Sequence, residues 1–481
     1  ELQTLGLAEV VEQLPQLITQ QRLGEAEALL YPALDQKPET GALWFYAGVI
    51  NATQGKYALA LECFVKSQRL EPHPSLWANI GGTLRQMNQP ELARDVMLRG
   101  LDQIGEDADL LGNLCGSYVN EGDPLTGIEY GERALAVRPD HGSAKFNLAL
   151  LHLEAGNFAR GFDLYAEGAH RHRIHKTYEP DPPDLTPELH EQLRGQGKRL
   201  IVWGEQGIGD ELMFATILED VRRDYEVIFD CHPRLESLHR AACWAHTDGY
   251  PIAFYATRKT AMDARGWHEA ADVKCAIGNL GRLYRREADA FPWRGPVYRA
   301  NADEVRQMRA HLEQVAQGRK VVGLATRGGT MSTARTYRIL SPEVLGPALS
   351  DPRYLFVSLD YEDMTGFGDY MAQHYGAGRF VWYPSVCWAW DYHHQAALVA
   401  ATDAVVTVCQ SVAHLSAAMG HPTYVLTPSR PAWRYGLSGE TWHWYPHSNA
   451  RLLRQCRDDW TPAVQSLRSA LEARFFQREA A

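Results

Sequence analysis

A repeat of about 34 residues constrains the fold of this chain more than any other sequence feature. Short turn segments recur along the first third, and the last residue of each is small, as close helix crossings require. These residues are Ala26, Ala60, Ala93, Gly127 and Gly161, at intervals of 34, 33, 34 and 34 residues. The turns keep the same step at Gly55, Asn88, Gly122 and Gly156. The period predicts five stacked helical hairpins that bury apolar faces only against their neighbours, whereas a plain helical bundle would not require it.

The repeat resembles the tetratricopeptide repeat (TPR). The best copy matches that pattern at Trp44, Gly48, Gly55, Tyr57, Ala60, Phe64 and Pro72. We expect a helical solenoid over residues 8–173, with a first copy that serves as a cap because Pro15 interrupts its pattern. The resemblance implies a groove that binds an extended peptide or protein. An intramolecular docking or dimerisation surface is an equally weighted interpretation, so an oligomer is possible.

Composition narrows the class of protein. A length of 481 residues predicts two to three domains, and 45% hydrophobic with 22% charged residues is typical of a globular chain. The formal charge of -11 disfavours nucleic acid as a partner, although a local basic groove stays possible. The eight cysteines form no CxxC pair, which argues against a disulfide framework or a zinc site. With no apolar run of membrane-spanning length and no recognisable signal segment, we expect a cytoplasmic protein.

The chain after the repeats alternates short apolar runs with helical stretches. Prolines in the segment TYEPDPPDLTPE mark a linker, because they favour extended chain without backbone donors. Alternating strands and helices predict two doubly wound parallel sheets. The expected organisation is a solenoid at 1–175, a linker at 176–197, a first Rossmann-like domain at 198–305 and a second at 306–481 with a C-terminal helix. We therefore expect a fragment without residues 1–173 to keep donor binding.

The stretch WGEQGIGDE follows the first predicted strand and leads into a helix. Ligands in parallel sheets bind at such carboxyl ends, where glycines let backbone approach them. Gly207 and Gly209 supply this freedom in what we expect to be the acceptor-side loop, to which Glu205 and Gln206 also belong. Asp210 begins the helix, where a carboxylate gains from the helix dipole. A catalytic role and a purely helix-starting role for Asp210 are equally open at this point.

A second loop, in VVTVCQSVAHLSAAMG, predicts a phosphate site. Ser411 stands at a likely helix start with Gln410 before it and Val412 and His414 after it, and free amides there attract a diphosphate. His414 could instead be a structural hydrogen-bonding residue. Another anion-binding loop is predicted after the strand at 320–327, where the positive charge of an arginine could offset the negative charge of a leaving diphosphate. Its residues are Arg327, Gly328 and Gly329.

Aromatic residues are dense in the segment RPAWRYGLSGETWHWYPHS. Trp433, Arg434 and Tyr435 could stack on a base or sugar, although packing between the domains is the competing interpretation. We expect Trp442 and Trp444 to be core residues.

The two predicted sheets resemble the paired Rossmann-like domains of GT-B glycosyltransferases. More closely, WGEQGIGDELMFA and TVCQSVAHLSAAMGHPTYVLTP, with PAWRYG and WYPHSNARLLRQ, resemble bacterial TPR glycosyltransferases related to heptosyltransferase family 9. The resemblance covers essentially the whole chain. It implies Asp210 as general base and Ser411 and His414 as phosphate-binding residues. Two departures stand out: Cys409-Gln410 replaces an Asp-Thr or Asp-Ser pair, and Ala325-Thr326-Arg327 replaces a Trp-Lys/Arg turn, so the donor need not be ADP-heptose.

These features predict a metal-independent glycosyltransferase that needs no cofactor beyond its nucleotide-sugar donor. The expected acceptor is a protein recruited by the repeats. An inactive TPR scaffold and a transferase acting on a nucleic-acid base or a glycan are the alternatives.

Overall fold

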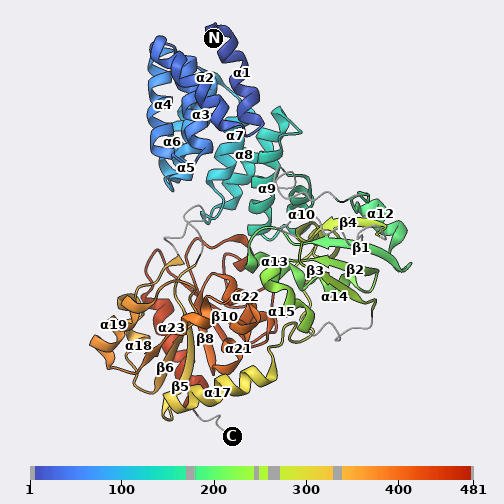
Figure 1. Cartoon of the computed structure of the whole chain (residues 1–481), viewed down its shortest axis with the longest axis vertical. Helices are drawn as coiled ribbons and strands as arrows, with labels where there is room; N and C mark the ends of the chain where they lie inside the picture. The colour runs from blue at the N-terminus through green and yellow to red at the C-terminus, as the bar shows by residue number, and fades with distance from the viewer. Residues whose placement is uncertain are drawn as a thin grey trace. The chain divides into compact units, whose positions relative to one another are not determined.

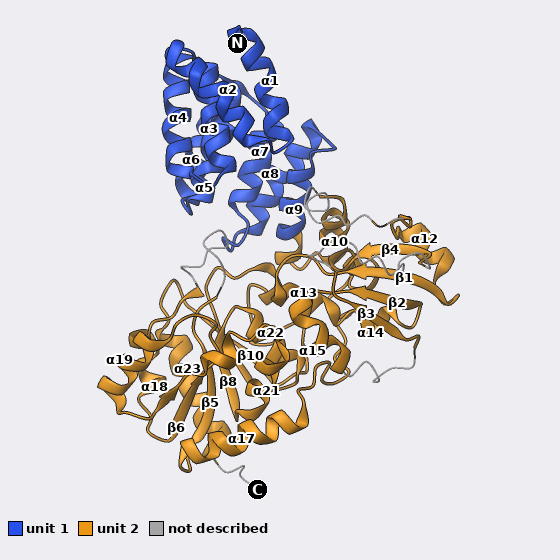
Figure 2. Cartoon of the chain, viewed as in Figure 1, with its two compact units in different colours: residues 1–151 blue, residues 152–481 orange. Residues whose placement is uncertain are grey.

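The computed structural model describes residues 6–168, 178, 180–242, 249–257, 271–328 and 338–477. The chain forms two compact units, residues 1–151 and 152–481 (Figure 2). The division falls inside α9 (Gly142–Glu154), so the last helix of the repeat series, α10 (Phe158–Glu167), belongs to the second unit.

The first unit consists of helical hairpins, which confirms the predicted solenoid elements (Figure 1). Besides the first part of α9, its helices are α1 Leu7–Thr19, α2 Leu23–Gln36, α3 Gly41–Thr53, α4 Tyr57–Leu70, α5 Pro74–Gln86, α6 Pro90–Ile104, α7 Ala108–Ser117 and α8 Pro124–Val137. Pro15 lies within α1, where Thr19 Oγ1 donates a hydrogen bond to the Pro15 carbonyl oxygen at 2.8 Å.

The backbone conformation at the turns between helices explains why the repeat keeps its period. Gly55, Asn88, Gly122 and Gly156 all have φ between 59° and 80°, a left-handed conformation in which glycine and asparagine are favoured. Close helix packing sets the other small positions. A Cβ on Gly48 would lie 2.4 Å from Phe64 Cε1, so any larger residue would displace α4 from α3.

The second unit contains two parallel sheets, as predicted from the alternating pattern. In the first sheet the strands are ordered β3-β2-β1-β4, with Ile201 opposite Ile228 and Val202 opposite Cys275. Its strands are β1 Lys198–Trp203, β2 Tyr225–Asp230, β3 Ile252–Tyr255 and β4 Val273–Ala276. The helices and turns around it are α12 Pro187–Leu193, α13 Ile208–Ala215, α14 Leu218–Val221, η1 Pro233–Leu235, α15 Glu236–Ala241, η3 Ile277–Leu280 and α16 Gly281–Tyr284.

The second sheet has six strands in the order β10-β9-β8-β5-β6-β7. Its strands are β5 Lys320–Ala325, β6 Tyr354–Ser358, β7 Phe380–Val381, β8 Ala404–Val408, β9 Thr423–Thr427 and β10 Ala450–Arg454. Helices lie on both faces (Figure 1). They are α17 Ala302–Ala316, α18 Pro342–Leu349, α19 Thr365–Tyr375, α20 Pro384–Cys387, α21 His393–Ala401, α22 Ser411–Ala418 and α23 Thr461–Phe475, with the short turn η6 Trp433–Tyr435. The two sheets are consistent with two Rossmann-like domains.

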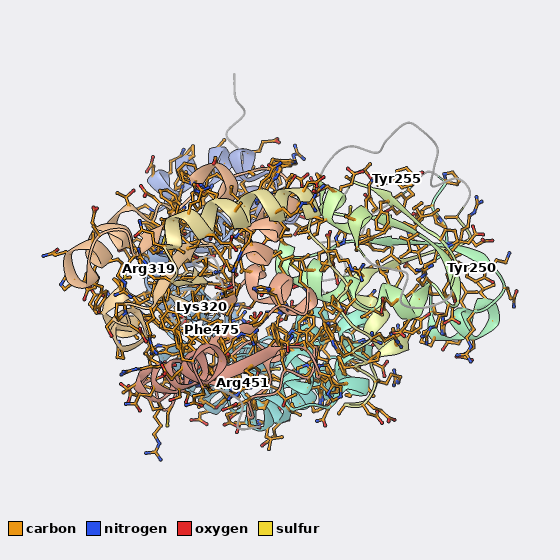
Figure 3. All side chains as sticks on the ribbon, turned by 90° about the horizontal axis from the view of Figure 1, so that it is seen from below. Tyr250, Tyr255, Arg319, Lys320, Arg451 and Phe475 are labelled. Atoms are coloured by element: carbon orange, nitrogen blue, oxygen red, sulfur yellow. The ribbon has the colours of Figure 1, made fainter. Side chains whose placement is uncertain are left out.

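The C-terminal helix α23 packs on the second sheet. Val464, Leu467 and Leu471 join the same apolar core as strand residues Val322 and Val406. At the far end of α23 the Lys320 ammonium lies 5.9 Å from the centroid of the Phe475 ring (Figure 3). Burial of this apolar face therefore anchors α23 within the second domain.

The predicted linker contains ordered structure. The Leu185 N–H donates to the Lys274 carbonyl oxygen at 2.8 Å, and the Lys274 N–H donates to the Pro183 carbonyl oxygen at 3.0 Å, which adds the linker to the edge of β4. The buried Lys274 ammonium forms an ion pair with Asp181. The linker therefore pairs with the first sheet before α12 begins.

Helix α10 packs into the second unit through aromatic residues. The Phe162 ring is fully buried against Gly281, where a Cβ would come within 2.3 Å of it. Its centroid lies 6.1 Å from that of Trp433, and the Phe158 centroid lies 4.8 Å from that of Phe291. Although the period assigns α10 to the solenoid, its apolar face is buried in the α/β region.

Candidate functional site

The beginnings of two helices meet in the second unit. Helix α13 follows β1 of the first sheet, and α22 follows β8 of the second. A Cβ on Gly209 would lie 3.2 Å from Ser411 Cα and 3.4 Å from His414 Cδ2, so the glycine permits this close approach. The structure thus brings together the two loops that the sequence predicts as acceptor-side and phosphate-side.

Asp210 occupies the centre of this junction. Its Oδ2 accepts a hydrogen bond from the Gly207 N–H at 3.3 Å, which caps α13, and its Oδ1 pairs with the Arg434 guanidinium. The Asp210 and Arg434 side chains are 18% and 17% exposed, so a bound molecule can reach the pair. Both roles left open for Asp210 thus remain available: it caps the helix, and its carboxylate reaches solvent.

His414 lies one turn into α22 and is 2% exposed. Its Nδ1 is 3.2 Å from the Tyr445 hydroxyl, and its Nε2 is 3.2 Å from the Tyr435 hydroxyl. Burial, together with the charge of Arg434, lowers the pKa of His414 well below its usual value, so the ring is neutral at pH 7. A direct contact with phosphate would require one of these two hydrogen bonds to break.

Ser411 and Gln410 flank the beginning of α22. Ser411 is partly exposed, and its hydroxyl accepts a hydrogen bond from the Tyr392 hydroxyl at 2.9 Å. Gln410 Nε2 donates to Asp360 at 3.3 Å, while Val412 is buried. Ser411 is therefore the side chain at this helix start that lies nearest to solvent.

The aromatic segment predicted for stacking is mostly interior. Trp433 and Tyr435 are 4% and 2% exposed, because Trp433 packs against Phe162, Phe214 and Trp444 while Tyr435 stacks on Trp442. Both rings are thus covered by protein in the described part of the chain. The prediction that Trp442 and Trp444 are core residues is confirmed.

Glu205 and Gln206 face helix α10. The Tyr165 hydroxyl donates to Glu205 Oε1 at 3.0 Å, as does the Gly278 N–H at 3.0 Å. Gln206 Nε2 donates to the Tyr165 hydroxyl oxygen. The buried Glu205 therefore holds the loop in place, whereas Gly207 is exposed to solvent.

Asp360 is a buried residue that the sequence analysis missed. It follows β6 and accepts hydrogen bonds from the Thr326 N–H at 2.8 Å, the Arg327 N–H at 3.2 Å and Gln410. It therefore ties together the loops after β5, β6 and β8. Its position directly after the apolar run YLFVSL was the available signal.

The loop after β5 is described as far as Gly328. The Arg327 guanidinium pairs with Glu362 at 3.3 Å, and Gly328 is closely packed against the Cys409 carbonyl oxygen. Gly329 lies outside the described residues.

Stability should fall as pH rises through the titration of Asp360. Burial raises its pKa to about 6. Between about pH 4 and about pH 6 the unfolded chain has lost this proton while the folded chain keeps it, so the free energy of unfolding decreases with pH and levels off above that range. Urea unfolding at several pH values, compared with Asp360→Asn, isolates the effect. An identical pH slope in the two proteins would contradict it.

Three large aromatic side chains are exposed in the segments that follow β6 and β7 of the second sheet. Tyr361, Trp388 and Trp390 are 49%, 58% and 67% exposed. Trp388 Nε1 donates to the Tyr361 carbonyl oxygen at 2.6 Å, and Arg234 Nε donates to the Trp390 carbonyl oxygen at 2.9 Å. We call these three residues the aromatic platform. Sequence analysis missed them because exposure is not visible in a run such as CWAWDY.

The residue ranges that the structure describes contain neither a metal-binding group nor a membrane-spanning helix. Across those ranges, no three His, Cys, Asp or Glu side chains are grouped so that they could bind a metal ion. None of the helices found there combines the length and apolar character needed to cross a bilayer.

Comparison with known proteins supports the N-terminal part of the fold. A tetratricopeptide-repeat family model matches residues 15–73 and 117–173. Together with the sheets, this defines the class: a TPR protein with a C-terminal α/β region of parallel sheets.

Among individual proteins, the chain is similar to protein FlbA of Caulobacter vibrioides. The two are 25% identical over 536 aligned residues, which cover 95% of this chain and 88% of FlbA. Among solved structures, PilF of Pseudomonas aeruginosa is 20% identical, with a TM-score of 0.31 over 34% of this chain and 76% of PilF. YrrB, a TPR protein with an unusual peptide-binding site, is 19% identical, with a TM-score of 0.26 over 33% of this chain and 84% of YrrB. The similarity to FlbA thus extends through both the repeat and the α/β parts of the chain.

Proposed function

We propose that the α/β region is a glycosyltransferase that moves a sugar from a nucleotide-sugar donor to an acceptor. The observation that carries the proposal is the meeting of α13 and α22, because it sets the partly exposed Asp210 opposite the first turn of a helix from the other sheet. Free amides at a helix start attract a diphosphate. Asp210 would take the proton of the acceptor hydroxyl while the new glycosidic bond forms and the bond from sugar to diphosphate breaks.

The pair between Asp210 and Arg434 links donor binding to proton transfer in this proposal. A diphosphate carries more charge than one carboxylate, and a guanidinium binds phosphate oxygens bidentately. We expect the diphosphate to draw Arg434 away from Asp210, which frees the carboxylate to act as base and stabilises the departing group. Arg327 and Ser411 would add further donors to the diphosphate. A clamp of amides and guanidinium groups requires no metal ion.

The repeat region would recruit a protein acceptor. Leu59, Leu92 and Leu125 lie near the beginnings of α4, α6 and α8, and they are 51%, 49% and 71% exposed. Leu59 and Leu92 stand at the same position of two successive repeats, and Leu125 stands one position earlier in the next. Exposed apolar side chains in neighbouring repeats favour an extended partner that contacts several repeats. The net charge of -11 makes a protein a better acceptor than a nucleic acid.

The aromatic platform would hold the nucleobase of the donor. Tyr392, two residues after Trp390, donates a hydrogen bond to Ser411, so the platform and the proposed phosphate site adjoin along the chain. Arg234 lies 6.0 Å from the Trp390 ring centroid and adds positive charge beside it. Indole faces that are exposed next to a cation favour stacking of a planar base.

Replacing Trp390 with Ala should therefore weaken nucleoside diphosphate binding. Stacking of one base on an aromatic ring contributes ~1–3 kcal/mol, and each 1.4 kcal/mol is about tenfold in affinity. Calorimetric titration measures the loss, and Trp390→Phe, which keeps a ring, should retain most of the affinity. Equal affinity in all three proteins would remove the base from this platform.

The proposed function is tested by a thermal-shift panel of sugar nucleotides and free nucleoside diphosphates. A donor present at 100 times its Kd should stabilise the folded chain by ~2.7 kcal/mol. If none of these compounds raises the melting temperature, the inactive-scaffold interpretation is favoured instead.

A further inference from the structure

Helix α10 reaches the candidate site through one side chain. Tyr165 is 1% exposed, its ring lies 6.3 Å from that of Phe214 in α13, and its hydroxyl bonds both Glu205 and Gln206. Burial and the nearby charges of Glu205 and Asp210 raise the pKa of Tyr165 well above its usual value. The hydroxyl therefore stays protonated and donates to Glu205.

The loop that Tyr165 contacts carries backbone strain. Gln206 has a φ of 57°, a left-handed conformation that a residue with a Cβ keeps only when its surroundings impose it. Its neighbours on both sides are fixed. Glu205 accepts from the Gly278 N–H, and Gly207 donates to Asp210. Tyr165 is thus bonded to the strained residue itself and to the carboxylate before it.

We propose that Tyr165 is a positioning residue for Asp210, supplied by the last helix of the repeat series. By holding Glu205 and Gln206, it fixes the loop whose next residue, Gly207, bonds the Asp210 carboxylate. The proposal rests on the proposed function for its catalytic consequence. Its structural part, an ordered loop from Gly204 to Gly207, does not depend on any substrate.

The first test is amide hydrogen exchange in the full chain. Tyr165→Phe keeps the ring in its packing and removes the hydroxyl, so exchange in a peptide that covers residues 203–211 should accelerate roughly 10-fold or more as the loop opens locally. Tyr225→Phe is the matched control, because Tyr225 is equally buried and its hydroxyl contacts His190 instead. Equal exchange of this peptide in the two variants would overturn the proposal.

The second test uses turnover with a sugar nucleotide that stabilises the chain in the thermal-shift panel. Tyr165→Phe should lower kcat roughly 10- to 100-fold with donor KM almost unchanged, because misplacing a reacting group by about 1 Å costs this much. Tyr225→Phe should keep kcat. If Asp210→Asn abolishes turnover and Tyr165→Phe does not change it, the positioning role is overturned and the base assignment stands. If Asp210→Asn also turns over normally, the base assignment fails and the catalytic part of this inference fails with it.

Discussion

Deletion of residues 1–173, which the sequence alone predicts to leave donor binding intact, should abolish cooperative unfolding of the remaining chain, because it removes α10. Deletion of residues 1–141 should preserve cooperative unfolding. The first deletion removes α10 and exposes the surface that Phe158, Phe162 and Tyr165 cover. Loss of one buried Phe side chain typically costs ~3–5 kcal/mol, and a whole domain is stable by only ~5–15 kcal/mol. Removing all three rings would therefore cost about as much as the whole stability of a domain.

The second deletion retains α9 and α10 as a hairpin. Soluble yield and the near-ultraviolet circular dichroism melt of both fragments check the prediction. The fragment that begins at Gly142 should also bind the same nucleotides as the full chain, because α13, α22 and the aromatic platform all belong to the second unit. A sharp melt of the shorter fragment, within a few degrees of the longer one, would show that α10 is dispensable to this unit.

The alternation of apolar runs made most of the fold predictable. Within the described residues, eight of the ten strands coincide with short apolar runs of the sequence, such as RLIVW for β1 and DAVVTV for β8. The other two are β4 and β10. Lys274 lies within β4, and its charge is satisfied by Asp181, 93 positions earlier in the chain. A pairing at that separation leaves no local pattern, so the short run VKCA does not stand out as a strand.

The helical period could not show which unit buries α10. Gly161 continues the repeat, and sequence spacing alone makes the fifth hairpin equivalent to the others. The apolar face of α10 has different partners, because Phe162 packs against Gly281 and Trp433, which lie more than a hundred residues later in the sequence. Tertiary partners of this kind, rather than periodicity, decide where a compact unit begins.

At the site, the loops that meet were predictable, but which side chains are buried was not. Gly209 and Ser411 were predicted to lie in ligand-binding loops, because ligand sites of parallel sheets lie at the carboxyl ends of the strands. These are the two loops that meet in the structure. Burial separates the aromatic residues: Trp433 and Tyr435 are interior while Trp388 and Trp390 are exposed. Both groups look alike in the sequence, since each is a short aromatic run after a strand.

Replacing Asp210 with Asn should lower transfer by roughly 10²–10⁴-fold, the usual contribution of a general base. Asn keeps an oxygen that accepts from the Gly207 N–H, so the cap of α13 survives. It loses the proton acceptor and the ion pair with Arg434. Because Arg434 is then released, affinity for a nucleoside diphosphate should hold or rise. Nucleotide release from an active sugar nucleotide, with an acceptor present, measures the effect.

Stability alone does not distinguish a base from a helix cap here, because Asp210→Asn also breaks a partly buried ion pair. Asp220→Asn supplies the matched control. Asp220 pairs with Arg285 and Arg294 in the same domain, is 12% exposed and lies in α14, so its loss should lower the melting temperature and leave turnover intact. If the two variants lose similar stability and both retain turnover, Asp210 acts through the dipole and ion pair of α13 alone, a contribution of at most ~2 kcal/mol from the dipole. If only Asp210→Asn loses turnover, the effect belongs to the proton acceptor, since Asp220→Asn also loses ion pairs with arginine.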